Sequence, residues 1–227
     1  MRPTTARAVH AAVAVVAAVA VVWQLALVVN GEAVLNESAR PDLGVRLARF
    51  ISYFTILSNL LVLACSLVLA RNPLQDGTRW RVVRMATLVG ITVTGVVHWF
   101  LLRPLLDLSG GSYAVDKLLH VVVPVVAVLA WVVAGPRGQA GRPQVLGALL
   151  WPLLWGAFTL VRGSATGWWP YPFIDVDTHG WGQVLLTLLG VAVLFGLCGA
   201  AYVALDRVLV RRFAQHDSPP TLSHRQP

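Results

Sequence analysis

Long apolar blocks separated by short polar segments make up most of this chain. Each block runs for about 20 residues with few or no charges, which is the length that an α-helix rising about 1.5 Å per residue needs to cross roughly 30 Å of hydrocarbon. A transmembrane β-barrel alternates apolar and polar residues over strands of about 10 residues, and that alternation is absent from the sequence. The pattern therefore predicts six membrane-spanning helices, over residues 8–29, 50–70, 83–102, 118–134, 144–161 and 183–205.

The composition narrows the class further. Of 227 residues, 57% are hydrophobic and 12% are charged, and the mean hydropathy is +0.70. A soluble domain of this size does not hide so much apolar surface, and two cysteines do not make a disulfide scaffold. We expect an all-α, polytopic integral membrane protein of the cell membrane, in which residues 1–214 form a single six-helix domain and residues 215–227 form a disordered cytoplasmic tail.

Charge predicts the orientation. Most of the 18 Lys and Arg residues lie before the first span, in the second and fourth loops, and after the last span. Short segments rich in Lys and Arg stay cytoplasmic, so both termini are expected inside and loops one, three and five outside. Topology and contact with anionic membrane lipids account for the net charge of +8, and no nucleic-acid partner is implied.

Polar side chains within the spans gather near the ends that are predicted to face outward, although such groups are costly in hydrocarbon. Ser52, Thr55 and Asn59 are three and four residues apart and share one face of the second span. Asp116 and His120 share a face of the fourth span for the same reason. We therefore expect one polar pocket near the outer leaflet, and the remaining polar residues at this depth are His98, Arg162, His179 and Gln183.

This set fits nucleophilic catalysis. A hydroxyl nucleophile needs a neighbouring base, and the base works better when a third group orients it. Thr55, His120 and Asp116 could fill these three roles. Arg162 either binds a substrate carboxylate or pairs with a nearby acid and snorkels outward. Side chains that could donate a hydrogen bond to an oxyanion or support the site are Asn59, Ser52 and His98.

Two other readings stay open. His98, His120 and His179, on three spans, could converge on one metal ion in a membrane hydrolase, although no H-E-x-x-H or C-x-x-C occurs. A non-enzymatic protein could bind a lipid or small ligand in the same outer pocket, or transport it. Transporters often contain two related halves and a polar path, and the chain shows no repeat and few polar residues in its inner half.

Three stretches resemble the androgen-induced and androgen-dependent membrane protein family, and nearest its uncharacterised bacterial branch. Tyr53-Phe54-Thr55-Ile56-Leu57-Ser58-Asn59 resembles that family's Y-x-T-x-x-x-N/D stretch. Leu119-His120-Val121-Val122-Val123-Pro124 is similar to its H-x-x-x-P element. Gly167-Trp168-Trp169-Pro170-Tyr171-Pro172 looks like its G-x-W-x-Y-P element before the last span. The order, the spacing by span and the expected topology agree across nearly the whole chain.

The resemblance implies a six-span threonine hydrolase, because eukaryotic members hydrolyse fatty acid esters of hydroxy fatty acids. It implies that Thr55 is the nucleophile and His120 the base, without a cofactor. Trp169 and Tyr171 also fit an outer aromatic belt, whatever the function. The resulting expectation is a carboxylic ester hydrolase that acts on a lipid ester through an acyl-threonine, with a substrate site formed by Arg162, Trp169, Tyr171, His179 and Gln183.

Overall fold

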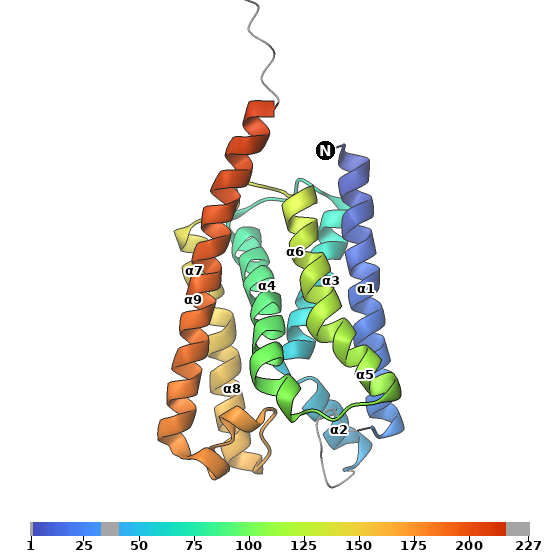
Figure 1. Ribbon diagram of the computed structural model, residues 1–227, viewed down its shortest axis with the longest axis vertical. Helices are drawn as coiled ribbons and strands as arrows, with labels where there is room; N and C mark the ends of the chain where they lie inside the picture. Colours follow the sequence, from blue (N-terminus) through green and yellow to red (C-terminus); the bar gives the residue numbers. More distant parts are fainter. Residues whose placement is uncertain (1, 33–40, 217–227) are drawn as a thin grey trace, which may run out of the picture.

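The structure, a computed structural model that describes residues 2–32 and 41–216, is an all-α bundle of upright helices (Figure 1). Six helical segments are long and apolar enough to cross a membrane, which confirms the predicted fold class of a six-span helical membrane protein. These segments are Pro3–Asn30, Phe54–Arg71, Thr78–Leu105, Gly110–Ala134, Arg142–Thr166 and Val176–Arg212.

Three of the spans comprise more than one labelled helix or turn, and the last is interrupted within α9 by a non-helical residue, Gly180. The third comprises α4 (Thr78–Val97), a π-helical turn η1 (His98–Leu102) and a 3-10 turn η2 (Arg103–Leu105). The fourth comprises α5 (Gly110–Lys117), a π-helical turn η3 (Leu118–Val122) and α6 (Val123–Ala134). The fifth comprises α7 (Arg142–Ala148) and α8 (Leu150–Thr166). The remaining helices are α1 (Pro3–Asn30), α2 (Leu43–Phe50), α3 (Phe54–Arg71), the 3-10 turn η4 (Pro172–Ile174) and α9 (Val176–His216).

Several helix ends differ from the predicted ones. The second span begins at Phe54 because Leu43–Phe50 forms a separate short helix, α2, in the first loop. The fourth span begins eight residues earlier than predicted, at Gly110. The last helix continues to His216, into the predicted tail, and residues 217–227 lie outside the described residues.

The fourth helix, α4, lies at the centre of the bundle and packs against α3, α6, α7 and α9. In the most apolar 18 residues of the span that contains α4, 61% of residues are buried. The corresponding value is 17% in the spans that contain α8 and α9. A Cβ atom at Gly95 of α4 would lie 3.1 Å from the carbonyl oxygen of His120. The absent side chain therefore lets α4 approach the fourth span closely at the position of this histidine.

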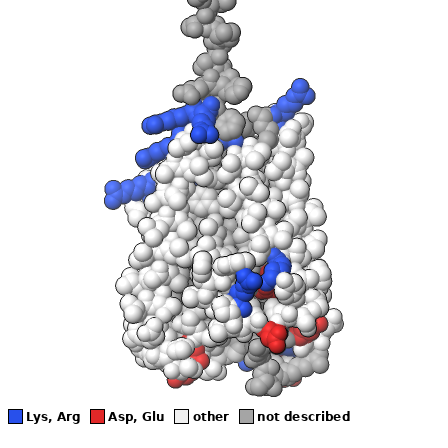
Figure 2. Space-filling view, viewed as in Figure 1, with Lys and Arg blue, Asp and Glu red and all other residues white. Residues whose placement is uncertain are grey.

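Charged side chains occupy the two ends of the bundle in the face that Figure 2 shows. Many Lys and Arg gather at the end where α1 begins and α9 ends, while Asp and Glu lie toward the opposite end together with a few Lys and Arg, and a largely uncharged belt lies between. This distribution follows the charge pattern of the loops. The N-in/C-in orientation stays a prediction from the positive-inside rule.

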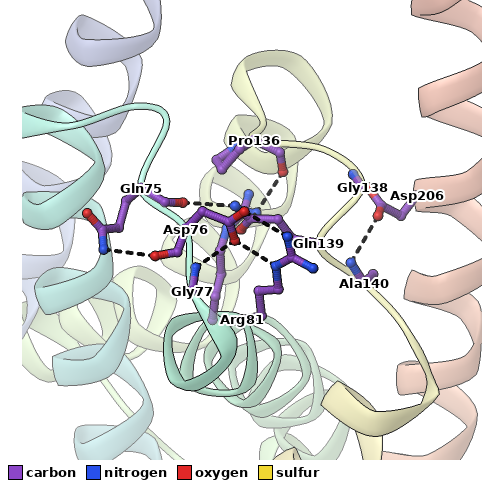
Figure 3. A network of polar contacts seen from close by, with 10 residues as sticks. Gln75, Asp76, Gly77, Arg81, Pro136, Gly138, Gln139, Ala140 and Asp206 are labelled. Carbon is purple, nitrogen blue, oxygen red and sulfur yellow. Dashed lines mark hydrogen bonds and ion pairs between the residues drawn. The ribbon is translucent and has the colours of Figure 1, made fainter.

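A buried polar network ties the loop between α6 and α7 to its neighbours (Figure 3). The guanidinium of Arg84, which is 5% exposed, donates hydrogen bonds to the carbonyl oxygens of Gly135 and Pro136 and to Oε1 of Gln139, at 2.7–3.0 Å. Asp206 of α9 accepts hydrogen bonds from the N–H groups of two loop residues, Gly138 and Ala140. These bonds fix the end of the bundle opposite the polar pocket.

An exposed ion pair lies beside this network. Arg81 donates two hydrogen bonds to the Asp76 carboxylate, at 2.6 and 2.7 Å, and the Gly77 N–H donates a third. Because these donors favour the charged carboxylate, they lower the pKa of Asp76 to about 2.

Candidate active site

The helix α3 begins one residue before Thr55, so this threonine lies in the first turn of a long helix. Backbone N–H groups of a first turn lack helical partners and carry partial positive charge. A hydroxyl placed there is better able to carry negative charge than one in the middle of a helix.

Thr55 and His120 face each other across the bundle. Oγ1 of Thr55 lies 3.2 Å from Nε2 of His120, and both side chains are largely buried. On the other side of the ring, Nδ1 of His120 lies 3.0 Å from Oδ1 of Asp116 and 3.0 Å from the Asp116 carbonyl oxygen. Both of these atoms only accept hydrogen bonds, so in the neutral ring Nδ1 carries the hydrogen and Nε2 is the free base. This is the tautomer that a general base for Thr55 needs.

Asp116 is 6% exposed and has three partners that can carry positive charge. Its Oδ2 lies 2.8 Å from Nζ of Lys117 and 3.4 Å from Nε2 of His98. Its Oδ1 is left to orient His120. The lysine balances the carboxylate charge, which would otherwise be costly at this depth.

Both histidines lie on π-helical turns, since His98 opens η1 and His120 is in the middle of η3. Pro124 has no N–H to donate to the carbonyl of His120, and at the same place the Val123 N–H bonds to the Leu118 carbonyl, five residues back. Such turns are rare and often occur at functional sites.

Tyr171, between α8 and α9, completes the surroundings of Thr55. Its hydroxyl oxygen lies 3.2 Å from Oγ1 of Thr55 and accepts a hydrogen bond from the Thr55 N–H, also at 3.2 Å. Asn59 links α3 to the turn η3, because its Nδ2 donates to the carbonyl oxygens of Thr55 in α3 and Leu119 in η3. The resemblance placed Tyr171 at the expected substrate site, but no sequence pattern pointed to contact with Thr55.

An apolar cavity of about 340 Å³ opens beside Thr55, between α3, α4, α8 and α9. Its polar lining residues include Thr55, Thr94 and Tyr171, and its apolar wall includes Phe54, Val93, Leu149, Trp155, Leu188 and Phe195. Its volume lies within the range of about 300–1,000 Å³ that is usual for small-molecule sites. The span boundaries did not predict this cavity, which exists because α8 and α9 pack loosely against α4.

A second cavity of about 40 Å³ also touches Thr55, and we call it the polar cavity because polar groups make up a larger share of its lining than of the first. Gln24, His98, Asp116 and His120 contribute its polar lining. One water needs roughly 10–15 Å³ and two to four polar partners, so a cavity of about 40 Å³ has room for about three waters. Thr55 thus touches both an apolar space and one that suits water.

The other predicted site residues lie apart from this centre. The Ser52 hydroxyl donates its hydrogen bond to the Ala48 carbonyl. Arg162 stacks over the ring of Trp168, 4.6 Å from its centroid, and Trp169 donates to Asp177. His179 and Gln183 are exposed at the start of α9 and line neither cavity. A break in α9 at Gly180, whose backbone is non-helical, separates the two residues, so they do not form the helical stripe that their spacing suggested.

The predicted set of three histidines does not form one cluster in the described residues. His98 and His120 are joined by Asp116 instead of His179, with one potential ligand atom from each within 4.8 Å of the others. The two imidazole rings are stacked, with centroids 3.9 Å apart and planes 12° apart. Ring nitrogens bind metals in the plane of the ring, so two nearly parallel rings do not converge on one ion at about 2.1 Å. The arrangement fits hydrogen bonding better than metal coordination.

Comparison of the chain with models of protein families, with curated proteins and with solved structures found no match. Fold and site together therefore define a class: a multi-pass helical membrane protein with six spans. Its buried polar centre is composed of Thr55, His120, Asp116, His98 and Tyr171.

Proposed function

We propose that this protein is a carboxylic ester hydrolase of the cell membrane that acts on lipid acyl esters from the outer leaflet. Thr55 is the nucleophile, His120 the general base, and Asp116 the group that orients the base. The observation that carries the proposal is the 3.2 Å contact between Thr55 Oγ1 and His120 Nε2 at the wall of an apolar cavity. The resemblance to the androgen-induced and androgen-dependent family supports the same two residues.

The apolar cavity can hold the acyl chain during acylation, and the polar cavity can supply the water for deacylation. The acyl chain occupies the apolar cavity, with its carbonyl carbon at Thr55. Oγ1 attacks this carbon as its proton passes to Nε2 of His120, which then protonates the departing alcohol. A water from the polar cavity next gives its proton to His120 and attacks the acyl-threonine, so that the fatty acid leaves and Thr55 is restored.

The paired cavities also favour hydrolysis over simple ligand binding. A lipid-binding protein or a transporter does not need a base that is oriented toward a hydroxyl. Nor does it need a second cavity beside that hydroxyl with room for water. A metal hydrolase is the second candidate, and the grouping of His98, Asp116 and His120 favours it. The stacking of the two rings weighs against it.

Labelling with a long-chain fluorophosphonate tests the proposal, because this probe phosphonylates activated hydroxyls with loss of fluoride. We expect an adduct on Thr55 in the purified protein and none in Thr55→Ala or His120→Ala. Thr87→Ala is the matched control: Thr87 is also buried, lines neither cavity, and its hydroxyl donates to the carbonyl of Val83 in its own helix. Labelling that persists in Thr55→Ala, or that requires added Zn²⁺, contradicts the proposal.

A further inference from the structure

The hydrogen-bond chain around Thr55 can be followed hydrogen by hydrogen. Nδ1 of His120 donates to Asp116, so Nε2 accepts. Thr55 has a single hydroxyl hydrogen, and Nε2 at 3.2 Å takes it. In its contact with Tyr171, Thr55 Oγ1 is then the acceptor, and Tyr171 is the donor. The chain of donors therefore runs from Tyr171 to Thr55, to His120 and to Asp116.

From this order we infer that Tyr171 is a catalytic residue, whose hydroxyl donates first to the nucleophile Oγ1 of Thr55 and then to the oxyanion of the tetrahedral intermediate. The inference rests on the proposed function, since it assigns a further role in the same reaction. It assigns the oxyanion donor to a residue outside the three that sequence spacing suggested.

Two of those three side chains already use their hydrogens elsewhere in the described structure. Both Nδ2 hydrogens of Asn59 go to backbone carbonyls, and the Ser52 hydroxyl donates to Ala48. The third, His98, has no hydrogen-bond partner at either ring nitrogen in the described structure, but its ring stacks on His120 beside Asp116 and does not line the apolar cavity in which the acyl group would lie. Tyr171 differs, because its hydroxyl points at the reacting oxygen itself.

The Tyr171 hydroxyl is held in place for this task. The Thr55 N–H at the positive end of α3 donates to the phenol oxygen, which polarises the O–H bond and makes it a stronger donor. The ring is 6% exposed and is fixed between Tyr53, with centroids 5.7 Å apart, and Phe173, with centroids 5.3 Å apart. Such a preorganised donor stabilises a developing charge without having to reorganise.

Tyr171 keeps its proton throughout the reaction. As Oγ1 bonds to the carbonyl carbon, the proton of Thr55 moves to His120 and the π electron pair moves onto the carbonyl oxygen. Oγ1 becomes a poor acceptor once it carries the acyl group. The carbonyl oxygen is then only two bonds from Oγ1, so a donor 3.2 Å from Oγ1 can transfer its hydrogen bond to it. When the C–O bond to the alcohol breaks, His120 returns the proton to the alcohol.

A single atom tests this role. Tyr171→Phe keeps the ring and removes the hydroxyl oxygen. Tyr202→Phe is the matched control, because Tyr202 is also 6% exposed and its hydroxyl lies 2.7 Å from a threonine oxygen, that of Thr92, at a distance from the site. We expect the maximal rate of fluorophosphonate labelling to fall about 10²-fold in Tyr171→Phe, with unchanged half-saturation by the probe, and to stay unchanged in Tyr202→Phe.

The possible results are distinct. Equal maximal rates in wild type and Tyr171→Phe overturn the role of Tyr171 and leave the proposed function intact, as does a loss confined to half-saturation. An unlabelled wild type overturns the proposed function, and the role of Tyr171 with it. If Tyr171→Phe melts far below Tyr202→Phe, 3-fluorotyrosine at position 171 replaces it. This more acidic phenol keeps the contacts and should label at least as fast as wild type, whereas slower labelling refutes the inference.

Discussion

Filling the apolar cavity should shorten the acyl chain that the protein accepts. Gly156 of α8 is buried and lines the cavity, yet a Cβ atom built there meets nothing within 4 Å. A leucine at this position therefore projects into the cavity instead of into neighbouring atoms. Gly156→Leu adds four carbon atoms to a space of about 340 Å³ without forcing the helices apart.

The size of the effect follows from the methylene groups that leucine displaces. If four side-chain carbons exclude about four methylenes of a bound chain, at about 0.8 kcal/mol for each, binding of a long chain loses about 3 kcal/mol. This free energy corresponds to a factor on the order of 10². A short acyl group that leaves the far part of the cavity empty loses nothing.

The assay compares 4-nitrophenyl esters of short and long fatty acids in the same detergent. We expect kcat/KM for the long ester to fall about 10²-fold in Gly156→Leu and that for the short ester to hold. Gly190→Leu serves as control, because Gly190 lies on an exposed face of α9, also has no atom within 4 Å of a built Cβ, and does not line the cavity. An equal loss for both esters, or none for either, refutes the assignment of the acyl site.

Three further predictions concern the orienting carboxylate and the opposite end of the bundle. Asp116→Asn should slow labelling of Thr55 by about 10²-fold or more, because the amide no longer fixes the tautomer of His120; labelling at the wild-type rate would contradict that role. Arg84→Met should lower the melting temperature far more than Arg81→Met, because each acceptor left unpaired costs about 1–3 kcal/mol; equal losses would show that the network is not stabilising. The pKa of Asp76, about 2, is depressed, so its pairing with Arg81 stabilises the fold above about pH 4 and is lost as the pH falls through about 2. Asp76→Asn should accordingly melt slightly below wild type at pH 7 and converge with it near pH 2, and a gap that persists at low pH would refute the pairing.

Helical spacing predicted one part of the site, the pair of polar side chains on the fourth span. Asp116 and His120 are four residues apart and do meet on one face, and Thr55 was placed at the same depth by its distance from the span end. Spacing cannot tell which way a stripe faces. His179 and Gln183 are also four residues apart, yet the helix is broken between them at Gly180 and both side chains are exposed.

The parts that sequence could not predict depend on irregular backbone and on packing. Tyr171 reaches Thr55 from a segment 116 residues away that contains only a 3-10 turn, and its position near the membrane interface suits a belt residue equally well. The π-helical turns carry the two histidines off the ideal helical register, and Pro124 was the only sign of one of them. The apolar cavity arises from loose packing of α8 and α9, which leaves no local pattern in the sequence.

The central claim is that Thr55 carries the acyl group during turnover, and trapping that intermediate tests it most directly. The protein is mixed with a long-chain 4-nitrophenyl ester, quenched in acid within the first turnover and digested for peptide mapping by mass spectrometry. The account predicts one acyl group on the peptide that contains Thr55, together with a burst of nitrophenol, and neither in Thr55→Ala. Release of nitrophenol without an acylated peptide, or an acyl group on another residue, would contradict it.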